Sequence, residues 1–150
     1  MHWLLLLTLF PLAGCSVLGL DRGDGQAGDF EDVYRYTAYD EGDRAVVTGT
    51  LYVVYVPSDV AGEPGRLRGR WELDATAEDV GPQDGEGTLE GTVEGDAFDV
   101  NLNPGMADNN VYLRGRFEED RARMTGEWSY TTFVGPTAGG RFEAERTGRR

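Results

Sequence analysis

The chain contains no lysine and no isoleucine, its single cysteine is Cys15, and its single histidine is His2. Beyond Cys15 no disulfide can form, so a folded domain must be stabilised by its core. That region also lacks the residues of a Ser-His-Asp triad, a Cys-His pair, a Schiff-base lysine or a histidine-ligated zinc or iron site. We therefore expect a protein that is not an enzyme and that uses no cofactor.

Positive charge is also scarce. The basic residues number 14 and are all arginine, whereas 27 residues are acidic, and the net charge is −13 at pH 7. Nucleic-acid backbones and anionic lipid surfaces attract proteins of positive charge. This balance argues against a nucleic-acid partner and against a polybasic contact with lipid.

Residues 1–14 contain no Lys, Arg, Asp or Glu. An apolar run over residues 4–10 precedes Pro11 and a site of small residues, which is the pattern of a secretory signal peptide. The run is too short to span a bilayer, which takes ~20 apolar residues.

The segment Leu12-Ala13-Gly14-Cys15 resembles the lipobox of bacterial lipoproteins. The resemblance implies a signal peptide of residues 1–14, diacylglycerol on the Cys15 sulfur, and often a third acyl chain, such as palmitate, on the new amine. Two or more chains hold a protein firmly to a membrane. By the same resemblance Ser16 favours the outer membrane, with the domain in the periplasm or at the cell surface. The alternative is an ordinary signal peptide with a chance cysteine.

Residues 15–28 are predicted to be a flexible tether behind the lipidated cysteine. Four glycines and two aspartates lie in residues 16–28, and large apolar residues are few. This leaves residues 29–150 for one folded domain.

Alternation of apolar and polar residues with period two dominates that domain. In residues 66–75, Leu67, Trp71 and Leu73 share one face and charged residues share the other, as in a half-buried strand. No segment has a 3.6-residue period, so we expect little helix. The expected strands span residues 45–56, 66–75, 86–93, 98–102, 111–117, 123–130 and 140–145. Residues 33–39 are either a further strand or an irregular lead-in.

A glycine repeatedly precedes a bulky apolar residue by two positions, as in Gly69/Trp71, Gly115/Phe117 and Gly126/Trp128. Glycine on the inner face lets a sheet coil around large side chains, which a small closed barrel requires. The predicted fold is all-β, a small antiparallel up-and-down barrel of about eight strands. A β-sandwich is the alternative. The charged outer face suits water better than a membrane lumen, so a soluble barrel is favoured.

This meander is similar to the lipocalin and avidin type of small β-barrel over residues 30–147. The resemblance implies an interior that can carry a small apolar molecule. Lipocalins have a Gly-x-Trp on the first strand, whereas Gly69-Arg70-Trp71 and Gly126-Glu127-Trp128 lie on later strands. No ligand-binding residues are therefore transferred.

Large aromatic side chains share the predicted inner face. We expect them to fill the barrel, because side chains suffice at this size; the alternative is a pocket for an apolar ligand. These residues are Trp71, Phe98, Phe117, Trp128, Tyr130 and Phe142. Tyrosines concentrate in the first two strands, where they form an exposed patch for a partner or cover the barrel mouth. They are Tyr34, Tyr36, Tyr39, Tyr52 and Tyr55.

Two oxygen-rich turns are weak candidates for calcium, which binds carboxylate and amide oxygens. They contain Asp40, Glu41 and Asp43, and Asp108, Asn109 and Asn110. Neither has EF-hand spacing, and such residues are ordinary in turns, so we predict no metal site. Carboxylate pairs for glycoside hydrolysis are also disfavoured, because the acidic residues fall mostly on outward strand faces and in turns.

The leading hypothesis is a lipid-anchored, non-enzymatic envelope protein that binds a partner protein or supports an envelope complex. The alternative is a lipocalin-like carrier of a small apolar ligand. An interior volume above ~300 Å³ would favour the carrier, and a filled interior would oppose it. Two inward carboxylates in one cleft would indicate an enzyme.

Overall fold

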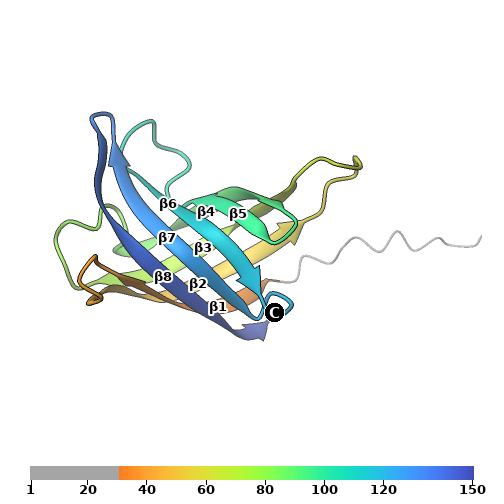
Figure 1. Ribbon diagram of the computed structural model, residues 1–150, viewed down its shortest axis with the longest axis horizontal. Coiled ribbons are helices and arrows are strands. Elements are labelled where there is room, and N and C mark those ends of the chain that lie inside the picture. The colour runs from red at the N-terminus through yellow and green to blue at the C-terminus, as the bar shows by residue number, and fades with distance from the viewer. Residues whose placement is uncertain (1–30) are drawn as a thin grey trace, which may run out of the picture.

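The alternating segments pair into a closed barrel of eight antiparallel strands in the computed structural model, which describes residues 31–150 (Figure 1). Each strand pairs with the next one along the chain, and β8 returns to pair with β1. The strands are β1 Asp32–Tyr39, β2 Ala45–Val56, β3 Gly65–Ala75, β4 Gly85–Glu94, β5 Ala97–Asn101, β6 Asn110–Glu118, β7 Arg123–Thr132 and β8 Gly135–Arg149. The predicted up-and-down barrel is confirmed, and the β-sandwich alternative is wrong.

The predicted signal peptide, the lipidation site Cys15 and the tether over residues 15–28 lie outside the described residues. Within residues 31–150 there is no helix long and apolar enough to cross a membrane.

The inner face follows the predicted alternation. On β3, Leu67, Trp71 and Leu73 are buried, while the intervening charged side chains are exposed or half-buried. Because successive residues of a strand point to opposite sides, one face of every strand reaches the shared core.

Glycine allows neighbouring strands to approach closely where β6 meets β7. Gly115 and Gly126 are directly paired, and a Cβ on either one would overlap a backbone carbonyl oxygen of the other strand. This close approach is what the glycine pattern predicts for a tightly coiled sheet.

The last strand differs most from expectation, because β8 spans 15 residues from Gly135 rather than starting at residue 140. Residues 135–139 lack an apolar alternation and form a strand through pairing with β7. The β1 pairing stops at Ala38 opposite Phe142, so residues 135–141 have no strand on their β1 side. Figure 1 shows this part of the β7–β8 hairpin projecting beyond the barrel. We call residues 135–141 the free edge.

The two ends of the barrel carry different connections (Figure 1). At one end lie both termini of the described chain and the connections over residues 57–64, 95–96 and 119–122; we call it the terminal end. The opposite end carries residues 40–44, 76–84, 102–109 and 133–134, and we call it the loop end.

Candidate functional site

The predicted aromatic residues fill the barrel instead of lining an open pocket. Trp71, Phe98, Phe117, Trp128 and Phe142 are each at most 8% exposed. The three phenylalanine rings pack on one another, with the centroid of Phe98 4.9 Å from that of Phe117 and 6.2 Å from that of Phe142. Such tilted contacts are typical of a packed aromatic core.

The two indole N–H groups are used within the fold. The Nε1 of Trp71 donates to the Leu102 carbonyl at 2.7 Å, and that of Trp128 donates to the Tyr39 carbonyl at 2.8 Å. A buried indole needs such a partner. Neither group is left to orient a ligand, which favours core packing over a carrier pocket.

A plug from the loop over residues 76–84 closes the barrel at the loop end. Val80 is 3% exposed and Gln83 is fully buried. The Tyr36 hydroxyl donates to Gln83 Oε1 at 3.1 Å, and Gln83 Nε2 donates to the Val80 carbonyl at 2.8 Å. Burial raises the pKa of Tyr36 far above its usual range, so its hydroxyl stays protonated as a donor. The sixth predicted aromatic residue, Tyr130, is half-buried and packs over Gly81 in this loop.

The tyrosines of β1 and β2 form no exposed patch, so that interpretation is wrong. Tyr34 and Tyr36 point inward and are at most 1% exposed, and Tyr52, on the outer face, is 7% exposed. The Arg70 guanidinium lies 3.5 Å from the Tyr52 ring centroid, in cation–π geometry.

Tyr34 and Tyr55 help to close the terminal end, as the mouth-covering interpretation expects. The Tyr34 hydroxyl donates to the Arg121 carbonyl at 2.8 Å, and the Arg121 guanidinium lies 3.8 Å from the Tyr55 ring centroid. At the loop end, the Tyr39 hydroxyl donates to Glu143 at 2.6 Å, and this bond lowers the pKa of Glu143.

The weak calcium candidates hold the loop over residues 102–109 together. Asp108 Oδ1 accepts from the Asn109 and Phe133 backbone N–H groups, both at 2.7 Å. Asn109 Oδ1 accepts from the Tyr130 hydroxyl at 2.6 Å, and Asn110 Oδ1 accepts from Asn101 Nδ2 at 2.9 Å. These oxygens are therefore engaged by protein donors.

The other acidic turn is also held by local contacts. Asp40 accepts from the Gly42 and Arg44 backbone N–H groups, each at 2.9 Å, and the Arg44 bond is the main reason that its pKa is lowered. Asp43 pairs with Arg141 at 2.7 Å. Among residues 31–150, no group of three or more His, Cys, Asp or Glu side chains is arranged to hold a metal ion.

An apolar tip stands at the loop end and was not expected from the sequence. The turn between β7 and β8 consists of Phe133 and Val134, which are 86% and 76% exposed. Met106, in the loop that Asp108 ties to Phe133, is 54% exposed. Two-residue hairpin turns favour Asn and Gly. Phe-Val between two strands is therefore unusual, and this is the feature of the sequence that could have indicated the exposed turn. We call Phe133 and Val134 the apolar tip.

A groove of about 650 Å³ lies at the loop end. One side is formed by residues 136–141 of the free edge, and the other by Asp40, Glu41 and Asp43, with Glu127 nearby. A smaller depression of about 440 Å³ continues from it toward residues 76–80 and shares Asp40 and Gly139.

The loop end is strongly acidic. Residues 40–44, 76–84 and 102–109 contain seven carboxylates and one arginine. Ion pairs engage Asp40 and Asp43, whereas Glu41, Glu78 and Asp79 are exposed and have no charged partner within residues 31–150. The loop end therefore carries an excess of negative charge.

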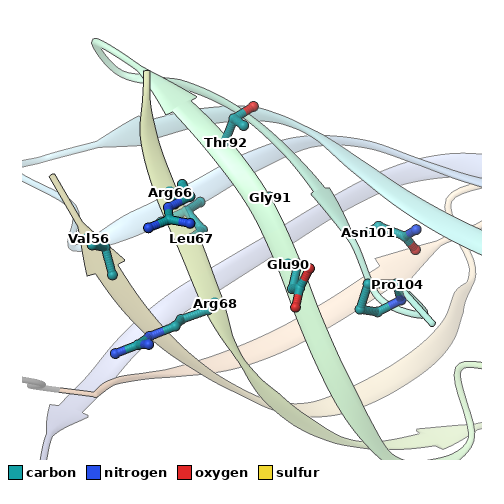
Figure 2. Close-up of a pocket in the computed structure, with 9 residues that line it drawn as sticks. All are labelled: Val56, Arg66, Leu67, Arg68, Glu90, Gly91, Thr92, Asn101 and Pro104. Atoms are coloured by element: carbon teal, nitrogen blue, oxygen red, sulfur yellow. The ribbon is translucent and has the colours of Figure 1, made fainter. Parts of the chain in front are cut away.

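A second groove, of about 580 Å³, lies on the outer wall across β3, β4 and β5. Figure 2 shows Arg66, Arg68 and Glu90 standing on the strand faces beside it. Arg68 and Glu90 are direct cross-strand neighbours, so this surface carries both charge signs.

Within residues 31–150, the buried polar side chains are those of Gln83 and Asn110. The carboxylates that line the groove at the free edge, those of Asp40, Glu41, Asp43 and Glu127, lie at the surface. Comparison of the sequence and fold with protein-family models, with curated proteins and with solved structures finds no match to this chain.

Proposed function

We propose that this chain is a lipid-anchored, non-enzymatic protein of the cell envelope that binds a partner protein through the loop end of its barrel. Lipid on Cys15 would anchor it to a membrane, with the outer membrane favoured by Ser16. The absence of histidine, lysine and cysteine beyond Cys15 supports a binding role over catalysis.

The observation that carries this proposal is the apolar tip. Phe133 and Val134 are the most exposed large apolar residues of the described chain, and they project from a barrel whose interior is already filled. Exposed apolar groups with a polar surround are typical of protein contact sites. The tip lies at the end of the barrel opposite the one at which β1 begins (Figure 1).

Anchoring is tested by replacing Cys15 with serine. We expect the parent chain to incorporate labelled palmitate and to sediment with membranes, and the Cys15→Ser variant to do neither. A Cys15→Ser chain that remains membrane-bound would remove the anchor from the proposal.

Partner binding is tested by photo-crosslinking in cells from a reactive amino acid placed at Phe133. The matched control places it at Val60, which is 55% exposed at the terminal end. We expect one dominant crosslinked protein from position 133 and not from position 60. The same products from both positions, or none from position 133, would contradict the proposal.

A further inference from the structure

A closed barrel normally has no strand edges, yet this one exposes part of β8. Residues 135–141 pair with β7 only, because the β1 pairing ends at Ala38 opposite Phe142. In an antiparallel sheet, every second residue turns its N–H and C=O away from a given neighbour. Apart from Pro136, which has no N–H, the free edge therefore presents backbone donors and acceptors to a further strand.

The surface around this edge can admit a further strand. Ala138 and Gly139 have a small side chain or none, and glycine in a strand permits another backbone to approach. At Gly140 the chain's own backbone already approaches, since a Cβ there would overlap the Tyr39 carbonyl oxygen. The groove of about 650 Å³ runs beside residues 136–141, within the range of ~300–1,000 Å³ that is typical of ligand clefts.

The charges on the far side of the groove determine which kind of segment fits it. Asp40, Glu41 and Asp43 face the free edge, and Glu127 lies in the same groove. Glu41 and Glu127 form no ion pair within residues 31–150, whereas Asp43 is engaged by Arg141. A strand laid along the edge would direct alternate side chains toward this acidic side, where basic residues fit.

We propose that residues 136–141 and the facing turn over residues 40–43 bind an extended segment of a partner protein with arginine or lysine at alternate positions. The backbone of the segment would add a strand to β8, and its basic side chains would meet Glu41 and Glu127. This inference rests on the proposed function, because it names the partner chemistry at the loop end.

A second copy of this chain is disfavoured as the occupant. Each copy has a net charge of −13. Pairing two free edges would bring two acidic turns together, and like charges across an interface disfavour association.

The test uses the full-length chain in detergent micelles and a capped hexapeptide that alternates arginine and valine. We expect backbone amide shifts and slower amide exchange at residues 137–141, and smaller shifts at residues 40–43. A peptide with glutamate in place of arginine should bind at least ~10-fold more weakly. Equal binding of the acidic peptide, or shifts confined to the terminal end, would overturn the inference.

A matched pair of variants tests the charges. Glu41→Gln with Glu127→Gln removes two exposed carboxylates at the groove and should weaken peptide binding by about fivefold, whereas Glu118→Gln with Glu119→Gln at the terminal end should leave it unchanged. An equal loss in both variants would mean that net charge alone attracts the peptide, against a specific groove.

The backbone contribution is tested on the peptide, so the fold of the protein is untouched. N-methylation of alternate residues removes the donors for strand addition, and we expect binding to be lost when the methylated face meets β8. Unchanged binding by both methylated registers would overturn strand addition, as would dimerisation of the chain through residues 136–141.

The two proposals fail differently. Crosslinking from Phe133 without peptide binding would leave a partner at the loop end but reject an extended basic segment. Peptide binding at residues 136–141 without any crosslink from Phe133 would keep the edge chemistry and reject the apolar tip as the partner site.

Discussion

The two ends of the barrel differ in how completely their polar and apolar groups are paired or covered. At the terminal end, Tyr34 donates to the Arg121 carbonyl, Arg121 covers Tyr55, and Glu31 and Arg150 exchange two backbone hydrogen bonds. At the loop end, a buried plug closes the mouth, but the apolar tip and the free edge remain uncovered.

This contrast supports the proposal that a partner binds at the loop end. A folded protein usually buries large apolar side chains and pairs or covers its strand edges, and groups that stay exposed often belong to an interaction site. The two most exposed apolar residues, Phe133 and Val134, and the free edge lie at the loop end, whereas Val60 at the terminal end is 55% exposed. The terminal end is closed by its own residues. At the loop end the plug closes the barrel interior, but the apolar tip and the free edge on the outside remain uncovered.

The largest effect is expected at the plug. Gln83→Ala would leave the buried Tyr36 hydroxyl without its acceptor and should lower the free energy of unfolding by about 2–3 kcal/mol. Urea unfolding followed by tryptophan fluorescence measures this change. Combining Tyr36→Phe with Gln83→Leu removes both polar partners and should restore much of the loss. A cost below ~0.5 kcal/mol for Gln83→Ala would mean that the plug does not close the mouth.

Alkaline pH tests the terminal end. Burial, with a smaller contribution from the Asp32 charge, raises the pKa of Tyr34 to about 12, whereas an unfolded tyrosine titrates near ~10. The folded state therefore favours the neutral hydroxyl. This stabilisation is complete below pH ~10 and is lost as the pH rises toward the folded-state value.

We expect the parent to lose about 2 kcal/mol more unfolding free energy than Tyr34→Phe between pH ~9 and ~12. Tyr112→Phe on the outer wall is the control and should follow the parent. If Tyr34→Phe and the parent decline in parallel, the Tyr34 hydroxyl is not buried in the native state.

A smaller gain is expected from relieving strain in the β6–β7 turn of the terminal end. Glu119, Asp120 and Arg121 have φ values of 51°, 57° and 66°, in a region that side chains disfavour. Asp120→Gly should therefore raise the free energy of unfolding by about 1 kcal/mol. Gly95→Ala, at a φ of 63° in the β4–β5 turn, is the reciprocal control and should destabilise. Destabilisation by Asp120→Gly would show that its side chain stabilises the turn.

The smallest stability effect is expected at the apolar tip. Phe133→Ser with Val134→Thr should change the free energy of unfolding by less than ~0.5 kcal/mol, because neither side chain is packed. The same variant should bind less of a hydrophobic dye than the parent. Val60→Ser, at the terminal end, is the matched control. A large loss of stability would mean that the tip packs on the barrel and is not free for a partner.

Much of the barrel wall could be predicted because the strand signal is local. Leu67, Trp71 and Leu73 alternate with charged residues, and the same rule placed Trp128 and Phe142 inside. The paired Gly115 and Gly126 were also expected to permit close strand approach. Each of these inferences needs only the residues two positions away along the chain.

The candidate site was harder to predict because it depends on partners far apart in the chain. Tyr34 and Tyr36 follow the same alternation as the other inward residues. Because Tyr39 and Tyr52 are also concentrated in the first two strands, an exposed tyrosine patch was an equally consistent interpretation. Gln83 looks like an ordinary loop residue until its contact with Tyr36, 47 positions away, is known.

The sequence by itself determined an all-β domain, its inner face, the lack of lysine and the lack of histidine and cysteine beyond Cys15, because alternation and composition are properties of the chain alone. Only the tertiary structure decided which end is open. Strand β1 has 8 residues and β8 has 15, and this difference in length leaves an edge beside an acidic turn only when the barrel closes and brings the two strands together.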